Sequence, residues 1–295
     1  MSRRALQFLA PAKVAAVLPL LERNLAKLGT HKAATPPARA SVAAVFRWRE
    51  REQRTLELLL VRRSINERDT WSGQIAFPGG KRQKSVPAGG DTSLSAIKAS
   101  ESDERVPWES PRETAQRETM EEIGLDLTTP HVRWIGSLPA IQTHLRTFWV
   151  TTQVYFIDIP AEEHAFEPVI QEKEIADVFW VDVQEFFNPD MIRPLATRPR
   201  LKNAVETCFG RLVFSCIYLP RPTHGDEYDD DVALRHPHDF ILWGLTLRMI
   251  SDLFRAAKSP LAIGDVMPHF ENRVVGDLAL FLYRYPHEAL KRGAA

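Results

Sequence analysis

Apolar and polar positions along the middle of the chain group into short runs rich in branched and aromatic residues, which predict strands. The expected strands cover residues 41–46, 56–61, 74–77, 132–138, 148–159 and 177–181. Two other segments carry apolar residues at helical spacing, one between Val14 and Leu28 and one between Ile241 and Leu253. Strands interspersed with a few helices predict the α/β fold class.

A further helix is predicted from its two ends. Ser110, followed by Pro111 and Glu113, forms a capping box with proline at the first helical position. Gly124 is typical of the residue that ends a helix. The helix is therefore expected to run from Pro111 to Ile123.

Three glutamates lie on one face of this helix. Glu118, Glu121 and Glu122 occupy positions i, i+3 and i+4, where like charges repel one another. A solvated acidic surface would explain such a cluster, because glutamate is a good helix former. A divalent cation such as Mg²⁺ or Mn²⁺ would also explain it, since these ions take oxygen ligands and are completed by water and substrate phosphates. The second explanation predicts phosphate chemistry.

The neighbours of these glutamates favour the metal. Gly80, Glu109 and the run from Arg117 to Leu125 stand in the order of the Nudix hydrolase signature, which this segment resembles. That signature is a glycine, a glutamate six positions later, and then Arg-Glu-x-x-Glu-Glu-x-Gly with an apolar residue. Here Glu109 lies 29 positions after Gly80, so 23 extra residues interrupt the signature. Their composition, without apolar periodicity, predicts a flexible insertion at about residues 82–108.

Further segments resemble one branch of the Nudix family, the coenzyme A pyrophosphatases. Residues 58–64, with the sequence LLLVRRS, and residues 73–81, GQIAFPGGK, match the extended signature of that branch. Residues 240–246, FILWGLT, are similar to its Ile-Trp-Gly-x-Thr segment. The resemblance covers roughly residues 40–254. It implies a Nudix-type α/β/α sandwich with a mixed sheet, extended by N-terminal and C-terminal helices.

The resemblance also implies which residues form a metal and catalytic site. Glu118, Glu121 and Glu122 are expected to hold Mg²⁺ or Mn²⁺ together with the loop residue Gly80, and Glu121 and Glu122 are expected to be catalytic. Arg117 is expected to serve catalysis by pairing with a neighbouring carboxylate such as Glu109 and so orienting the acids.

Family members often place a further acid, as base or extra ligand, on a loop after the helix. Glu174 matches this position best, Glu172 is the second choice, and a surface charge is the alternative explanation for Glu174.

Substrate contacts are expected beside these acids. Arg63 suits bidentate recognition of phosphate oxygens and Lys81 suits a point-charge contact, although both could be ordinary surface cations. Gly79, within the branch signature, is the third residue expected at the substrate. His144 and Arg146 precede the strand predicted at 148–159, where a substrate-facing loop is expected.

The expected reaction is metal-dependent hydrolysis of a nucleoside diphosphate linkage. The branch implies coenzyme A or its derivatives as substrate, with 4′-phosphopantetheine and 3′,5′-adenosine diphosphate as products. A close alternative is a Nudix pyrophosphatase for ADP-ribose, dinucleotides or damaged nucleoside triphosphates, because one fold accepts different flanking pockets. An alternative of another class is a non-catalytic module that senses a nucleotide or binds a partner, but such a module has no need for three repelling glutamates.

Composition agrees with a globular enzyme that acts on a small-molecule nucleotide. The 295 residues are 44% apolar and 26% charged with a formal net charge of zero, so no global basic field favours nucleic acid. No apolar stretch reaches the length of about 20 residues that spans a bilayer, so no membrane partner is expected. The two cysteines predict buried thiols rather than a disulfide framework. A monomer and a homodimer both remain open.

Composition also divides the chain into three parts. Residues 1–35 combine an apolar stripe with basic residues and few acids, which suits either a helix packed on the domain or a mitochondrial transit peptide. The Nudix domain is expected at residues 40–257, with an acidic loop at about 222–237, and a C-terminal extension at 258–295. The expected compartment is accordingly cytoplasmic or mitochondrial.

Overall fold

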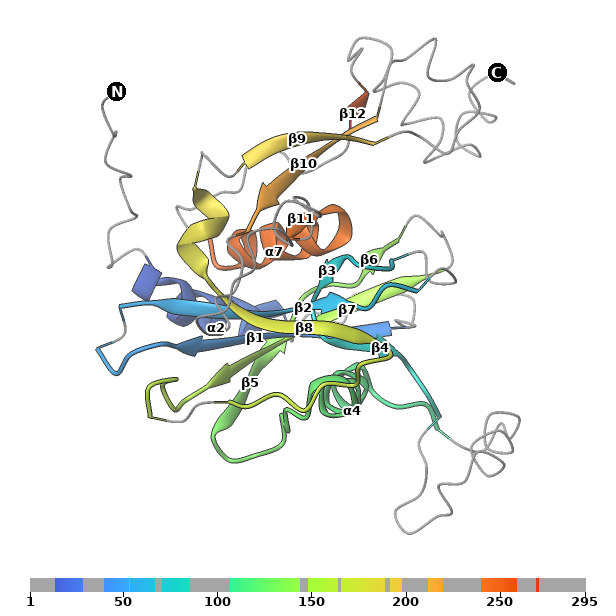
Figure 1. Cartoon of the computed structure of the whole chain (residues 1–295). Helices are drawn as coiled ribbons and strands as arrows, with labels where there is room; N and C mark the ends of the chain where they lie inside the picture. The colour runs from blue at the N-terminus through green and yellow to red at the C-terminus, as the bar shows by residue number, and fades with distance from the viewer. Residues whose placement is uncertain are drawn as a thin grey trace, which may run out of the picture.

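The computed structural model describes residues 14–28, 40–52, 54–66, 71–84, 107–143, 148–163, 166–188, 192–197, 212–219, 240–258 and 269–270. In this part of the chain an eight-stranded mixed sheet lies between helices, and a second sheet has four strands (Figure 1). The predicted α/β class with a mixed sheet is confirmed.

The large sheet is built around β1 (Ala40–Trp48), which is buried along most of its length. β1 pairs in parallel with β7 (Trp149–Ile157) and antiparallel with β2 (Leu56–Arg63), within the order β3-β2-β1-β7-β5. The other strands of this sheet are β3 (Ile75–Ala76), β4 (Gly79–Lys81), β5 (Val132–Ser137), β6 (Ile141–Gln142) and β8 (Ile175–Asp182). A strand covered on both faces reads as a continuous apolar run, which explains the sequence of β2.

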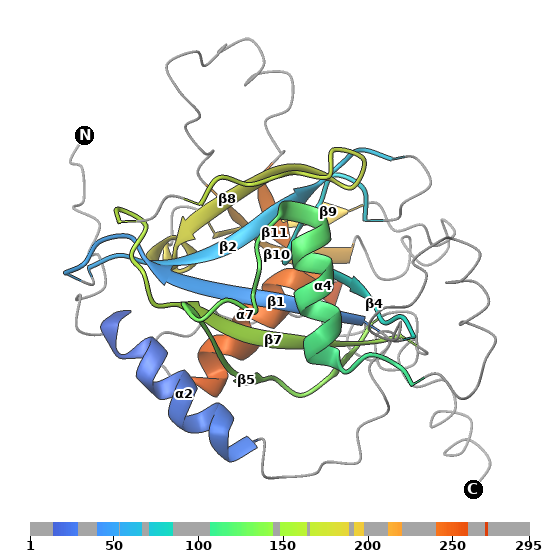
Figure 2. The same cartoon turned by 90° about the horizontal axis from the view of Figure 1, so that it is seen from below.

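Helices cover both faces of this sheet, as the expected sandwich requires. α4 (Pro111–Ile123) lies on one face, where its Ala115 and Ile123 join a buried cluster with sheet residues (Figure 2). α2 (Val17–Leu28) and α7 (Gly244–Ala256) share a second buried cluster on the other face. β8 leads into a short 3₁₀ helix, η1 (Val183–Phe187).

α4 has the boundaries and the caps that its sequence predicts. The Ser110 hydroxyl accepts a hydrogen bond from the Glu113 N–H at 3.2 Å, and the Glu113 carboxylate accepts one from the Ser110 N–H at 2.6 Å. Gly124 ends the helix in the left-handed region, with a φ of 72°. Because both caps use neighbouring residues, the helix could be located from sequence alone.

The apolar stripe near the beginning of the chain forms α2 and belongs to the core. Leu21 and Leu25 are 0% and 1% exposed. Gly136 of β5 permits close approach of the helix, since a Cβ at this position would lie 2.7 Å from the Leu25 Cβ. Asn24 Nδ2 donates to the main-chain carbonyl of Ala256 in α7 at 3.0 Å. Residues 17–28 are thus packed on the domain.

The late apolar stripe is helical only in part. Ile241 and Leu242, predicted as its first residues, lie instead in β11 (Ile241–Trp243), and α7 begins at Gly244. β11 pairs antiparallel with β10 (Leu212–Tyr218). The helical prediction was wrong for these two residues because a partner strand distant in sequence decides their conformation.

The second sheet was not predicted. β10 pairs antiparallel with β9 (Ile192–Thr197) and with β12 (His269–Phe270), in addition to β11. The expected C-terminal extension therefore contributes a short strand to this sheet.

Some predicted features lie outside the described residues, namely residues 85–106 of the insertion, the acidic loop at 222–237, His144, Arg146 and Cys208. Cys216 is a buried thiol. Among the helices that the structure describes, none is long and apolar enough to cross a membrane.

Candidate active site

Two glycines bring β4 against the glutamates of α4. The main-chain N–H of Gly79 donates to Glu122 Oε2 at 2.8 Å. Gly80 lies directly beside the Glu118 carboxylate, because a Cβ added to Gly80 would be 2.4 Å from the carboxyl carbon. Only a residue without a side chain leaves this space for the carboxylate. β4 therefore places the predicted loop glycines next to two of the three predicted metal ligands.

Gly79 is also fixed by β1 on its other side. Its φ is +147°, and a Cβ would lie 2.4 Å from the carbonyl oxygen of Ser41 and 2.5 Å from the Cα of Val42. In the antiparallel pairing of β4 with β1, Val42 stands opposite Gly79. The Gly79 N–H donates to Glu122, so Gly79 supports that glutamate. Its expected contact with substrate stays a prediction.

Arg117 connects the carboxylates of the site. Its Nε and Nη2 donate to the two carboxylate oxygens of Glu109 at 2.6 and 3.0 Å, which is the predicted pairing. Its Nη1 lies 3.0 Å from Glu118 Oε1 and 2.8 Å from Glu121 Oε2, and Nη2 also donates to the Lys81 carbonyl at 3.0 Å. Burial alone would lower the pKa of Arg117, but the Glu109 bond and the surrounding carboxylates raise it above its usual value. The guanidinium is therefore permanently charged and fixed at the centre of three acids.

Among the acids of the site Glu122 is buried and Glu118 is half-buried, and the neighbouring charges perturb both. Burial raises the pKa of Glu122, which is 2% exposed, to about 8, against the opposing hydrogen bond from Gly79 and the Arg63 charge. Burial also raises the pKa of Glu118, against the opposing charge and hydrogen bond of Arg117. The charge of Glu174 contributes to both shifts in the same direction as burial. A cation bound among these groups would relieve this repulsion.

The donor set suits a hard divalent cation. Glu118, Glu121, Glu122 and the Gly80 carbonyl offer only oxygen ligands, as Mg²⁺ and Mn²⁺ prefer. Across the described residues, no three acidic, histidine or cysteine side chains form a closed metal cluster. Arg117 Nη1 engages one oxygen each of Glu118 and Glu121. The negative charge gathered at Glu118 and Glu122 nevertheless fits a cation.

Glu174 and Arg63 lie at the edge of the same cluster. The exposed Glu174 acts electrostatically on Glu118 and Glu122, whereas Glu172 is not among the charges that shift either pKa. The Ser64 N–H, next to Arg63, donates to the Glu174 carbonyl at 2.9 Å, which joins the end of β2 to this loop. The structure thus brings Glu174 to the site from a segment about fifty residues beyond α4.

Two residues that the sequence did not indicate complete the surroundings of Glu109. The Thr114 hydroxyl donates to Glu109 Oε2 at 3.1 Å, and Arg82 Nε donates to the Glu109 carbonyl at 2.6 Å. Thr114 could have been found from the helical register, because it lies one turn before Glu118 on the same face. No local signal points to Arg82, since it is the first residue of the expected insertion. Lys81, which lies between Gly80 and Arg82 in the sequence, is exposed.

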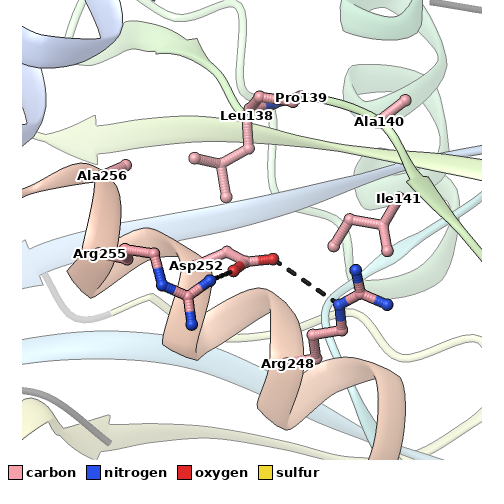
Figure 3. Close-up of a pocket in the computed structure, with 8 residues that line it drawn as sticks. All are labelled: Leu138, Pro139, Ala140, Ile141, Arg248, Asp252, Arg255 and Ala256. Atoms are coloured by element: carbon pink, nitrogen blue, oxygen red, sulfur yellow. Dashed lines mark hydrogen bonds and ion pairs between the residues drawn. The ribbon is translucent and has the colours of Figure 1, made fainter. Parts of the chain in front are cut away.

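A separate cavity lies on the α7 side of the sheet (Figure 3). Its volume is about 320 Å³, and it opens between α7 and the connection from β5 to β6. Asp252 points between Arg248 and Arg255, with which it forms ion pairs. The other lining residues are Leu138, Pro139, Ala140, Ile141 and Ala256. None of the predicted site residues lines this cavity.

Comparison with known proteins identifies the family of this chain. The NUDIX domain family matches residues 37–200 of this chain. The match covers more than half of the chain, and the chain belongs to the Nudix family.

Individual relatives are distant. An uncharacterized protein of Schizosaccharomyces pombe is 27% identical over 247 residues, which cover 74% of this chain and 66% of that protein. This chain thus spans just under two thirds of that relative. A NUDIX hydrolase from Alicyclobacillus acidocaldarius is 16% identical, with a TM-score of 0.33 over 79% of this chain and 100% of that chain.

The NUDIX domain of Shewanella oneidensis NrtR, solved with ADP ribose, is 18% identical, with a TM-score of 0.32 over 55% of this chain and 84% of that chain. At these TM-scores the family assignment rests on the domain match and not on superposition.

Proposed function

We propose that this protein is a Mg²⁺- or Mn²⁺-dependent hydrolase of a nucleoside diphosphate linkage, with coenzyme A or its derivatives as substrate. The observation that carries the proposal is the gathering of Glu118, Glu122 and Glu174 around the loop glycines, with Arg117 fixed beside them. A binding module would gain nothing from keeping repelling carboxylates buried. A phosphate-cleaving enzyme needs them to hold cations.

The chemistry of the phosphoric anhydride linkage suggests a role for each residue of the site. A phosphoric anhydride is shielded by anionic oxygens, so its charge must be offset before water can attack in line. Divalent cations held by Glu118, Glu121, Glu122 and the Gly80 carbonyl would supply that neutralisation and make water more acidic. Arg117 holds Glu118 and Glu121 in orientation through its fixed guanidinium.

The groups at the edge of the site act on water and on phosphate. Glu174, exposed and next to the buried acids, accepts the proton of the attacking water in this proposal. Arg63 binds phosphate oxygens through its fork of donors, and Lys81 adds a positive charge at the end of β4. The products of coenzyme A would be 4′-phosphopantetheine and 3′,5′-adenosine diphosphate.

The choice of coenzyme A rests on the three segments that resemble that branch, and the fold brings them together. Residues 58–64 and 73–81 meet where β2 pairs with β3, with Val61 opposite Ala76. β3 in turn contacts β11, which carries part of residues 240–246. The Arg62 guanidinium lies 5.7 Å from the centroid of the Phe240 ring. Segments far apart in sequence thus contact one another around β3, which supports a shared role in substrate choice.

The test compares hydrolysis of coenzyme A, ADP-ribose, diadenosine polyphosphates and 8-oxo-dGTP in parallel, with Mg²⁺, with Mn²⁺ and with neither. Metal-dependent release of 4′-phosphopantetheine is expected. Glu122→Gln should lower kcat by about 10²-fold or more, in the range of losses seen when a key electrostatic group is removed. Glu167→Gln changes an exposed glutamate outside the site and serves as the matched control.

Each outcome separates the alternatives. Turnover of another compound by the wild type would retain the reaction and reject the coenzyme A assignment. Absence of turnover with all four compounds, together with nucleotide binding that Glu122→Gln leaves intact, would favour the sensing module.

A further inference from the structure

The two ends of the insertion lie side by side. Lys84 and Trp108 form an antiparallel bridge, and the Glu109 N–H donates to the Gln83 carbonyl at 2.9 Å. We call residues 82–84 together with Trp108 the stem. Paired residues of antiparallel strands are only about 5 Å apart. The chain therefore leaves the segment after Gly80 and returns before Glu109 at nearly the same place. The insertion therefore adds no separation between the two halves of the loop.

The stem binds Glu109 directly. Arg82 Nε donates to the Glu109 carbonyl at 2.6 Å, and the Gln83 N–H donates to Glu109 Oε2 at 3.1 Å. Thr114 and Arg117 donate to the same carboxylate, which belongs to a residue only 9% exposed. Hydrogen bonds thus fix both the main chain and the carboxylate of Glu109. They orient the carboxylate oxygens as acceptors for Arg117.

The outer pair of the stem, Lys84 and Trp108, also makes a side-chain contact. Lys84 Nζ lies 5.8 Å from the centroid of the Trp108 ring, within reach of a cation–π contact. The indole remains 55% exposed, so burial in the core does not account for its position.

We propose that the stem is the positioning device of the interrupted Nudix loop, and that Arg82 and Gln83 are positioning residues. They fix Glu109, Glu109 fixes Arg117, and Arg117 orients Glu118 and Glu121. In an uninterrupted signature, a short loop would hold its glutamate near the glycine; here the stem performs this task across 29 positions. This proposal depends on the proposed function in one respect only, namely that the oriented acids bind a metal ion.

The first experiment measures the Arg117 Nε–H directly, in the full chain without metal or substrate. By ¹⁵N-detected NMR, this proton is expected to exchange slowly with water, because it donates to the buried Glu109. Arg82→Ala should accelerate exchange by about tenfold or more, as expected when a hydrogen bond to a charged group loses its support. Arg82→Lys, which retains a donor for the Glu109 carbonyl, should restore most of the protection.

The matched control is Arg54→Ala, an exposed arginine between β1 and β2. If Arg82 served only general stability, Arg82→Ala would lower the unfolding temperature and leave Arg117 exchange unchanged at lower temperature. That result would overturn the proposal. Failure of the chain to hydrolyse coenzyme A would not bear on it, since the readout needs no substrate.

The second experiment closes the stem with a turn. Replacing residues 85–107 by Asn-Gly connects Lys84 to Trp108 through a two-residue hairpin, the connection that suits an antiparallel pair. Protection of the Arg117 Nε–H and the dissociation constant for Mn²⁺, measured by calorimetry, should both stay within about threefold of the full chain. Arg82→Ala should weaken Mn²⁺ binding by about three- to tenfold. Loss of protection in the closed chain would show that the stem does not suffice and would overturn the proposal.

Discussion

At the scale of single residues, the site depends on two adjacent glycines that serve different ends. Gly80 leaves room for the Glu118 carboxylate, while Gly79 lies against the backbone of β1 and donates to Glu122. A flexible side-chain end can move away from a new methyl group, whereas a strand backbone cannot. The same substitution should therefore mainly weaken metal binding at Gly80 and mainly lower stability at Gly79.

Gly80→Ala should lower the free energy of unfolding by less than about 1 kcal/mol and weaken Mn²⁺ binding at least tenfold, because the methyl group displaces the Glu118 carboxylate. Gly79→Ala should cost roughly 2–4 kcal/mol, because its φ of +147° disfavours a side chain and the Cβ meets Ser41. Urea denaturation and calorimetric titration measure both quantities. Equal stability losses in the two variants would contradict this account.

The buried Glu122 predicts how stability depends on pH in the metal-free protein. Its pKa is raised from the ordinary 4.5 to about 8 in the folded state. Between these values the folded protein holds a proton that the unfolded chain has released, so the free energy of unfolding should fall as pH rises from about 5 to 8. The slope can reach about 1.4 kcal/mol per pH unit for one group.

Denaturation curves of Glu122→Gln over the same pH range provide the comparison. The variant should be more stable than the wild type at pH 8 and show a shallower slope, with Glu118 supplying the remainder in the same direction. A slope as steep as that of the wild type would show that burial does not raise the pKa of Glu122.

At the scale of elements, α2 belongs to the folded domain. Its apolar stripe is buried against β5 and α7, where Leu21 is fully enclosed and Asn24 donates to Ala256. Leu21→Ala should lower the free energy of unfolding by about 2–4 kcal/mol, since it removes a buried side chain and leaves a cavity. Leu20→Ala, on the half-buried side of the same helix, is the control and should cost clearly less. Similar losses in both variants would argue against the packed arrangement of α2.

Most of the large elements could be predicted from sequence, and the predictions that failed have a common cause. The boundaries of α4 followed from Ser110, Pro111 and Gly124, all of which act within the helix itself. The helical prediction for Ile241 and Leu242 was wrong because they lie in β11, which is stabilised by pairing with β10 and not by its own neighbours in sequence. Periodicity reports which face a segment buries, but it does not report which distant strand pairs with it.

At the scale of the whole molecule, cation binding should be linked to stability. The repelling acids of α4 and Glu174 destabilise the metal-free fold, and a cation bound only by the folded state stabilises it by mass action. Saturation with Mg²⁺ or Mn²⁺ at about 100 times Kd should add about 2.7 kcal/mol, measured as a rise in the unfolding temperature that a chelator reverses. In Glu122→Gln the rise should shrink. No shift with either ion would contradict the proposed metal site.

The sequence by itself determined the helix and the register that puts Glu118, Glu121 and Glu122 on one face. These follow from the helical repeat and from caps that involve only neighbouring residues. Only the tertiary structure decided that Gly79 supports Glu122, that Glu174 reaches the cluster, and that Arg82 and Gln83 close the interrupted loop over Glu109. These contacts join segments far apart in the chain, and burial then sets the charge of the acids they surround.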